Sequence, residues 1–111
     1  MIDRFEDPRL RVADPETLAE SFDIVINGTS AGLVGALPKV APTAIAGSLV
    51  YDMVYGLNAR PFCDWALEHG AAKAVDGLGM LVEQAAEAFL LWHGVRPDSA
   101  AVLRRLRETG V

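Results

Sequence analysis

The sequence predicts an α/β fold in which helices flank a mostly parallel sheet, and three observations lead to this prediction. Short runs of β-branched and apolar residues alternate with helical segments along the chain. Three of these runs stop at glycine or at small polar residues, as strands do where they leave a sheet. The resulting order of strand, loop, strand, helix, strand and helix is typical of a layered fold with a parallel sheet.

The first half of the chain is predicted to hold two strands. Residues 9–12 show a weak pattern for a short strand, and Asp14 followed by Pro15 predicts a brief helix that ends by Ser21. The run Phe22–Asn27 is typical of strands buried on both faces of a parallel sheet. Glycines and prolines in residues 31–47 then predict a loop with room for a single helical turn. The second strand is predicted within Ser48–Tyr55.

The second half alternates helices with one more strand. Pro61 opens a helix that ends just before Gly70, and residues 73–76 form a third short strand. Pro97–Ser99 begins a last helix, whose apolar stripe consists of Val102, Leu103 and Leu106.

The segment between Gly77 and Gly94 is predicted to be one long helix, since it contains good helix formers and no proline. At about 100° per residue its polar residues Glu83, Gln84 and Glu87 fall in one narrow sector. Because the rest of its surface is apolar, we expect a core helix that is covered on most sides.

Gln84 lies one helical turn from Met80 and points the same way, on the border of the predicted buried face. Its side-chain amide can donate and accept, so we expect it to have a partner. Two partners stay open on the sequence alone: a nearby backbone group and a ligand hydroxyl.

The composition excludes several classes of function. A chain of 111 residues forms one domain at most. Its net charge of −5 and pI of about 4.8 argue against non-specific binding to nucleic acid or to an anionic membrane. The cluster of Arg104, Arg105 and Arg107 is therefore expected to be a solvated helix end. With the single cysteine Cys63, no metal-ligand spacing and no visible signal peptide or membrane segment, we expect a cytoplasmic protein without a metal.

Ligands of parallel α/β sheets bind at the carboxyl ends of the strands. Three such ends here carry Asn27–Ser30, Met53–Tyr55 and Asp76–Gly77. Their hydroxyls and glycines suit a nucleotide or a small polar ligand, although Thr29 and Ser30 are equally consistent with a turn cap. The spacing of Asp23 and Asp52 gives no paired-carboxylate geometry, so we expect solvated or capping roles for them.

Three motifs stand in order along the chain: FDIVINGTSAG at Phe22–Gly32, YDMVY at Tyr51–Tyr55 with Pro61–Phe62 after it, and GLGMLVEQAA at Gly77–Ala86. The tail Phe89–Pro97 continues the pattern. Together they resemble the shikimate dehydrogenase family over most of the chain from about Phe22 onward. The resemblance implies a partial Rossmann-like layer, with residues 1–111 forming a single domain similar to the C-terminal part of the family's NADP-binding domain.

The family is a two-domain, NADP-dependent oxidoreductase that reduces 3-dehydroshikimate to shikimate in aromatic amino acid biosynthesis. The resemblance implies that Asn27–Ser30 lies along the nicotinamide ribose. The cofactor-binding residues that it implies are Thr29, Ser30, Met53 and Gly77. The substrate-binding residues that it implies are Tyr55, through its hydroxyl, and Gln84, through its amide.

Several family features have no counterpart in this sequence. They are the Gly-rich phosphate loop, the Asn-Arg-Thr segment that favours the 2′-phosphate of NADP, and the N-terminal substrate domain with its catalytic Lys and Asp. Lys39 and Lys73 lie in other contexts, so we assign no catalytic residue. Arg60 stands where the family often has Thr, which leaves the implied sites unchanged.

The leading hypothesis is therefore a portion of an NADP-dependent shikimate dehydrogenase that contributes half a cofactor site and part of a site for shikimate or 3-dehydroshikimate. The alternatives are a non-catalytic nucleotide- or small-ligand-binding module and an interaction subunit that docks on a separate N-terminal half. We expect the isolated chain to be inactive and to form a homo-oligomer, because its apolar helix and open sheet edge need cover.

Overall fold

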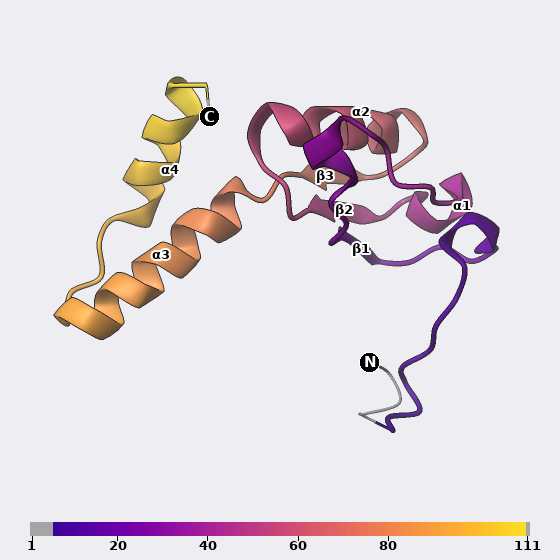
Figure 1. The fold of residues 1–111 in the computed structure, drawn as a ribbon, viewed down its shortest axis with the longest axis horizontal. Coiled ribbons are helices and arrows are strands. Elements are labelled where there is room, and N and C mark those ends of the chain that lie inside the picture. The colour runs from indigo at the N-terminus through magenta and orange to yellow at the C-terminus, as the bar shows by residue number, and fades with distance from the viewer. Residues whose placement is uncertain (1–5, 111) are drawn as a thin grey trace.

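The structure is a computed structural model that describes residues 6–110. At its centre lies a three-stranded parallel sheet with the strand order β1-β2-β3 (Figure 1). The strands are short: β1 is Ile24–Asn27, β2 is Leu49–Asp52 and β3 is Lys73–Val75. The α/β class and the parallel sheet predicted from the sequence are confirmed.

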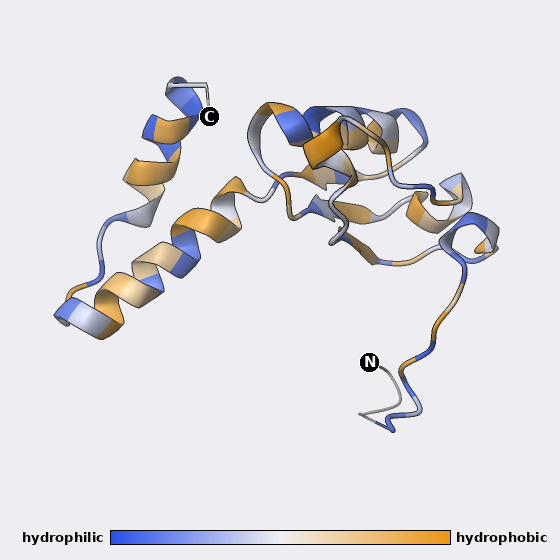
Figure 2. Cartoon of the chain, viewed as in Figure 1, coloured by the Kyte–Doolittle hydropathy of each residue, from blue (hydrophilic) through white to orange (hydrophobic). Residues whose placement is uncertain are grey.

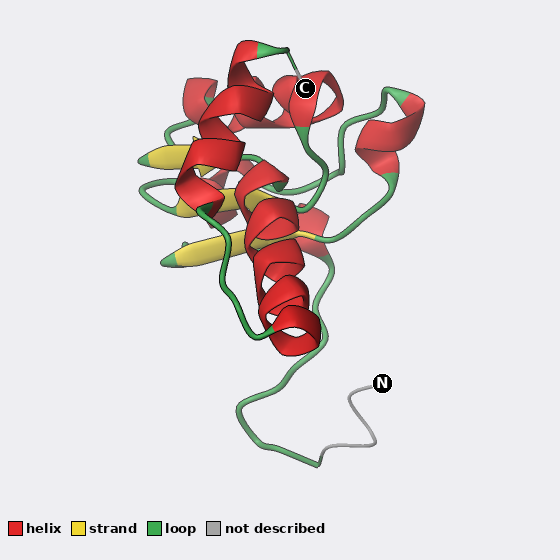
Figure 3. Cartoon of the chain, turned by 90° about the vertical axis from the view of Figure 1, so that its left-hand side faces the viewer, coloured by secondary structure: helices red, strands yellow, loops and turns green. Residues whose placement is uncertain are grey.

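The described residues form four α-helices, of which two lie against the sheet and two extend from it (Figures 1 and 3). α1 (Pro42–Ile45) precedes β2, and α2 (Arg60–Glu68) connects β2 to β3. α3 (Leu78–His93) leaves the end of β3 and points away from the sheet, and α4 (Ser99–Glu108) folds back beside it. Single 3-10 turns occur at Pro15–Thr17, Ala31–Val34 and Gly56–Ala59.

The core lies between α2 and one face of the sheet. Its buried cluster consists of Ile45, Val50, Phe62 and Ala66. Val25 and Ala74 pack against this cluster from the neighbouring strands, since alternate residues of a strand point to the same face. The register pairs Val25 with Val50 and Val50 with Ala74, so that one row of apolar side chains crosses all three strands under α2.

On the opposite face of the sheet β1 is open within residues 6–110, which corrects the prediction that Phe22–Asn27 is buried on both faces. Ile24 and Ile26 point to this face and are more than half exposed, and Leu49 beside them is also exposed. The strand is apolar on both sides as predicted, but α1 and α2 cover one side only and α3 projects away. Figure 2 shows the hydrophobic residues that this leaves along β1 and α3.

The N-terminal predictions hold in part. Residues 9–12 form no strand, because no neighbouring strand offers them a hydrogen-bonding edge. Asp14 caps the next turn as predicted, since its side chain accepts a hydrogen bond from the Glu16 amide at 2.9 Å, but only a 3-10 turn follows. Residues 31–47 hold two short turns, Ala31–Val34 and α1, where the sequence predicted one.

The three longer helices begin and end close to where the sequence places them. Gly94 closes α3 in the left-handed conformation with φ of +73°, and Gly70 follows α2 with φ of +100°. Asp98 caps α4 through a 3.1 Å hydrogen bond from the Ala101 amide. These ends depend on neighbours a few residues away, which is why local sequence signals locate them.

α3 is nevertheless no core helix, contrary to the prediction. Only Leu78, Val82 and Ala86 are buried, and they form a single stripe at a spacing of four residues. Leu91 is 82% exposed and Trp92 is 76% exposed. α4 packs along one side of the helix, while Phe89, Leu90, Leu91 and Trp92 near its end stay exposed. Figure 2 shows how much of α3 is hydrophobic.

Glu83 and Glu87 both pair with Arg96, which follows α3. None of the helices within residues 6–110 has the length and apolar character needed to cross a membrane.

The turn from β3 into α3 requires glycine at position 77. A Cβ atom on Gly77 would lie 2.3 Å from the Met53 carbonyl oxygen, a distance that no side chain tolerates. A Cβ atom on Gly79, two residues later, would meet no atom within 4 Å. The backbone of β2 and the start of α3 are therefore in direct contact at Gly77.

We predict opposite effects of alanine at these two glycines. Gly77→Ala should lower the free energy of unfolding by about 1–3 kcal/mol or more through overpacking. Gly79→Ala should leave it unchanged or raise it by up to about 1 kcal/mol, because alanine favours a helix over glycine. Urea denaturation followed by circular dichroism measures both, and equal losses in the two variants would contradict the close approach at Gly77.

Candidate functional site

The ends of the three strands are joined by backbone hydrogen bonds. The Met53 amide donates to the Asn27 carbonyl at 3.0 Å, and the Gly77 amide donates to the Val54 carbonyl at 3.0 Å. A Cβ atom on Gly28 would lie 3.4 Å from the Met53 sulfur, so the turn after β1 passes near the Met53 side chain. Thr29, Ser30, Met53 and Gly77, the residues predicted to bind a cofactor, therefore gather at one edge of the sheet.

The turn after β1 is organised by Asn27, which is 6% exposed. Its Oδ1 accepts hydrogen bonds from the Thr29 amide at 3.0 Å and from the Thr29 hydroxyl at 2.8 Å. Thr29 thus has the turn-forming role that the sequence left open. Ser30 precedes the Ala31–Val34 turn and is exposed, and its hydroxyl makes no capping hydrogen bond.

The end of β2 places a buried carboxylate beneath two exposed side chains. Asp52 is fully buried, and its Oδ1 accepts from the Val54 amide at 3.0 Å and from Asn27 Nδ2 at 3.4 Å. Burial raises the pKa of the Asp52 carboxyl, against which the hydrogen bonds from Val54 and Asn27 act. Asp52 therefore has the capping role that the sequence predicted. Its side chain is not solvated, which was the alternative prediction. Met53 and Tyr55 are both exposed beyond it.

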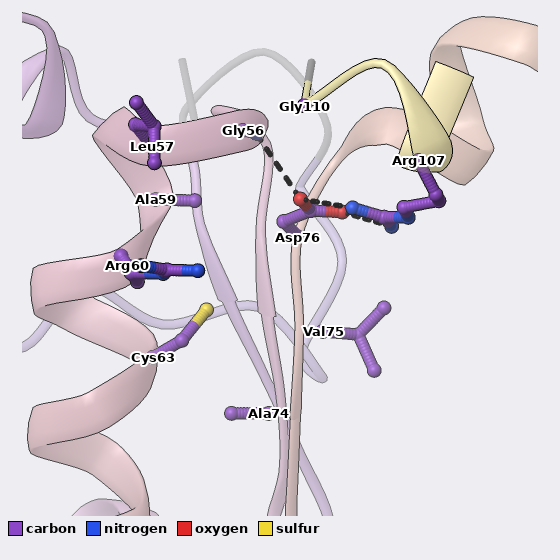
Figure 4. A pocket seen from close by; sticks show the side chains of 10 residues that line it. All are labelled: Gly56, Leu57, Ala59, Arg60, Cys63, Ala74, Val75, Asp76, Arg107 and Gly110. Atoms are coloured by element: carbon purple, nitrogen blue, oxygen red, sulfur yellow. Dashed lines mark hydrogen bonds and ion pairs between the residues drawn. The ribbon is translucent and has the colours of Figure 1, made fainter. Parts of the chain in front are cut away.

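Asp76, at the end of β3, holds three segments together (Figure 4). Its Oδ2 accepts from the Gly56 amide at 3.1 Å, and its Oδ1 accepts from the Leu78 amide at 3.2 Å. Arg107 of α4 donates to both carboxylate oxygens, at 2.7 and 2.6 Å. The prediction that Arg107 belongs only to a solvated helix end is therefore wrong, because its guanidinium links the end of α4 to the residue that follows β3.

Two cavities flank the strand ends. One of about 430 Å³ lies beside Asp76 and Arg107, with Arg60 and Cys63 of α2 in its wall (Figure 4). Burial raises the pKa of the Cys63 thiol to about 11, so the sulfur is uncharged at neutral pH. The other, of about 410 Å³, lies along β1 under the turn at residues 27–29 and is lined mostly by apolar side chains.

Gly77 is buried, and the Met53 backbone alone explains why it is glycine. Gln84 lies about 10 Å along the α3 axis from Gly77, at about 1.5 Å per residue. It is exposed, which corrects the expectation that it borders a buried face. Tyr55 is exposed as well, so the assignment of these two residues to the substrate stays a prediction. Residues 6–110 also contain no cluster of three or more potential metal ligands.

We predict that the ion pair of Asp76 and Arg107 contributes to stability in a pH-dependent way. The hydrogen bond from Arg107 lowers the pKa of Asp76 below its usual value of 3.8, so the contribution is present above about pH 4 and is lost as the pH falls through the lowered pKa. Asp76→Asn should cost about 1 kcal/mol at pH 7, a value reduced for the half-exposed guanidinium.

Urea denaturation between pH 7 and pH 2 measures this difference, which should shrink at the acid end. Asp64→Asn, at an exposed position of α2, serves as the matched control and should change little at any pH. If Asp76→Asn lowers the free energy of unfolding equally at pH 2 and pH 7, the ion pair with Arg107 does not cause the pH-dependent stability.

Comparisons with known proteins show which family this chain is similar to. Residues 77–107, which cover α3 and most of α4, match the family model described as the shikimate 5'-dehydrogenase C-terminal domain. The NADP(+) shikimate dehydrogenase of Alkalilimnicola ehrlichii is 56% identical over 109 residues, which are 96% of this chain and 40% of that protein. The enzyme of the same name from Saccharophagus degradans is 57% identical over 90 residues, which are 80% of this chain and 32% of that protein.

Solved structures give the same result for the fold. An Ael1 enzyme from Pseudomonas putida matches with a TM-score of 0.85 and 46% identity, over 94% of this chain and 39% of that one. A shikimate dehydrogenase in complex with NADP+ matches with a TM-score of 0.64 and 29% identity, over 80% and 32%. The chain thus spans 40% or less of the length of these two relatives and two structures. In sequence and in fold, it is similar to the C-terminal portion of shikimate dehydrogenases.

Proposed function

We propose that residues 1–111 act as one domain of an NADP-dependent shikimate dehydrogenase, which reduces 3-dehydroshikimate to shikimate. The observation that carries this proposal is that three family-like motifs lie together at one edge of the sheet. There the Met53 amide donates a hydrogen bond to the Asn27 carbonyl, and the Gly77 amide donates one to the Val54 carbonyl. The printed names of the relatives, which are NADP(+) shikimate dehydrogenases, support the same activity.

The strand-end edge fits a cofactor with a flat, largely apolar ring and a polar sugar. The cavity of about 410 Å³ supplies an apolar wall under the turn at residues 27–29. Thr29, Ser30 and the exposed Met53 would contact the cofactor from two strands, and the Gly77 backbone would contact it from the third. Bound NADPH supplies hydride to a carbonyl carbon, and this chain would bind and orient it.

The substrate would lie beyond the nicotinamide, toward α3. The exposed Tyr55 would offer its hydroxyl and the exposed Gln84 its amide, and both side chains are free to take polar partners. We assign no proton-transfer residue to this chain. That chemistry, and the loop that holds the pyrophosphate, would come from residues outside these 111.

The open surfaces favour a second candidate role, docking on a separate N-terminal half. The uncovered face of β1 and the outer side of α3 expose Ile24, Ile26, Leu91 and Trp92. Exposed apolar surface of this kind marks interfaces. A partner half would cover it in the cell, and a second copy of the chain would cover it in isolation.

We predict that the isolated chain forms a two-fold dimer or larger oligomer at micromolar concentration and does not oxidise NADPH with 3-dehydroshikimate. Sedimentation equilibrium and absorbance at the NADPH band measure the two properties. Leu91→Lys with Trp92→Lys should weaken association, because the charges would lie in the contact, while helix content stays unchanged. A folded monomer would contradict the association, and turnover above background would contradict the inactivity.

We predict that Gln84 contributes to substrate binding in the complete enzyme. The test uses a chimera in which the missing N-terminal portion comes from the Alkalilimnicola ehrlichii relative, which is 56% identical to this chain where the two align. Gln84→Ala should cost about 1–3 kcal/mol in kcat/KM for 3-dehydroshikimate, the range for losing a polar partner in a closed site.

The KM for NADPH should change little in this variant, because Gln84 lies about 10 Å along α3 from the strand ends. Glu87→Ala, one turn further along the same helix and paired with Arg96, is the matched control. Unchanged kcat/KM for 3-dehydroshikimate in Gln84→Ala would remove this residue from the substrate site.

A further inference from the structure

Asp52 is a buried carboxylate that the proposed cofactor and substrate contacts do not use. It has no exposed surface, and its Oδ2 has no hydrogen-bond partner among the described residues. Burying such a group is unfavourable unless other contacts compensate, and an apolar side chain would fill the same place at no such cost. The position of its other oxygen, Oδ1, suggests what the carboxylate does.

Oδ1 lies between the ends of β1 and β2. It accepts from the Val54 amide at 3.0 Å and from the side-chain nitrogen of Asn27 at 3.4 Å. Both contacts are donors, so Oδ1 must be an acceptor whether the carboxyl group is ionised or protonated. Asp52 therefore requires that Asn27 turn its NH2 group inward and its carbonyl oxygen outward.

The outward oxygen of Asn27 sets the hydroxyl of Thr29. The Thr29 amide, which can only donate, points to this oxygen at 3.0 Å, and the Thr29 hydroxyl lies 2.8 Å from the same atom. The hydroxyl must therefore give its single proton to Asn27. One of its lone pairs faces the Ala31 amide at 3.4 Å, and the other is left toward solvent, where Thr29 is exposed.

We propose that Asp52 is a positioning residue: through the Asn27 amide it fixes the Thr29 hydroxyl as a hydrogen-bond acceptor toward the ligand. This point of the site then selects a ligand group that donates, such as a sugar hydroxyl or an amide N–H, over a phosphate or carboxylate oxygen. We call the three residues the Asp52–Asn27–Thr29 relay. The ligand half of the proposal rests on the proposed cofactor contact of Thr29, whereas the relay itself does not.

The relay is tested first on the ligand-free chain by NMR. Asp52→Leu should shift the side-chain NH2 signals of Asn27 and speed hydrogen exchange of the Thr29 amide by about fivefold, the factor for one ordinary hydrogen bond. Asp52→Asn should rescue both readouts, because the Val54 amide holds its carbonyl oxygen where Oδ1 lies. Signals of Ala66 in α2 report whether the core is intact. Unchanged Asn27 and Thr29 signals in Asp52→Leu would overturn the relay.

A pH titration of the unmodified chain keeps the test decisive if Asp52→Leu does not fold. The chemical shifts of the Asn27 NH2 protons should change over the same pH range as the chemical shift of the Asp52 carboxyl carbon. Asp52→Asn should abolish this change in the Asn27 signals. A purely structural role of Asp52 predicts no such coupling, and its absence in the folded chain would overturn the proposal.

The ligand half is tested in the chimera with the N-terminal portion of the Alkalilimnicola ehrlichii relative, because the loop that holds the pyrophosphate would lie outside these 111 residues. The chimera is titrated with NADP+ and, separately, with inorganic phosphate. NADP+ should shift the Thr29 amide signal, and its Kd should rise about fivefold in Thr29→Val but little in Thr29→Ser. Phosphate at millimolar concentration should leave Thr29 unmoved, and a shift as large as that with NADP+ would overturn the selection for donors. No NADP+ shift at any strand end, with the ligand-free results as predicted, would refute the proposed cofactor contact and leave the relay standing.

Discussion

The site depends on the hydrogen bonds that hold the three strand ends in register. Met53 donates to the Asn27 carbonyl and Gly77 donates to the Val54 carbonyl, each at 3.0 Å. Parallel strands bring their carboxyl ends to one edge, but strands of three or four residues have few ladder bonds with which to fix it. These backbone hydrogen bonds lie just beyond the strands. Together with the Asp52 and Asp76 carboxylates, they continue the pairing of the strands into the loops. The close contact of Gly77 with the Met53 backbone follows from this extension, and so does the direction in which α3 leaves the sheet.

The same arrangement leaves much apolar surface uncovered. α2 covers one face of the sheet and α4 lies along one side of α3, while the other face of β1 and the end of α3 have no cover among residues 6–110. The chain spans 40% or less of the relatives' length, and a shikimate dehydrogenase built from it would need the remainder both to supply the catalytic groups and to cover these surfaces. Stability and activity would then both depend on the remainder of the enzyme.

The sequence predicted the features that depend on residues close by in the chain, namely helix caps, helix ends and strands. Asp14 and Asp98 cap their turns, Gly94 closes α3, and the β-branched runs become the strands, since each signal acts over a few residues. It did not predict which apolar faces are covered, because the cover of α3 and β1 depends on segments far along the chain, such as α4 for α3. The pairing of Arg107 with Asp76, 31 residues away, left no local signal. Asp52 was predictable as a cap, from an aspartate at a strand end, but its complete burial follows from α2 packing over it.

Recombination of two separately purified pieces tests whether this chain supplies one part of an NADP-dependent shikimate dehydrogenase. This chain would be mixed with the N-terminal portion of the Alkalilimnicola ehrlichii relative, and oxidation of NADPH would be followed with and without 3-dehydroshikimate. We expect oxidation that requires both pieces and the substrate. A stable complex of the two folded pieces that oxidises no NADPH would contradict it.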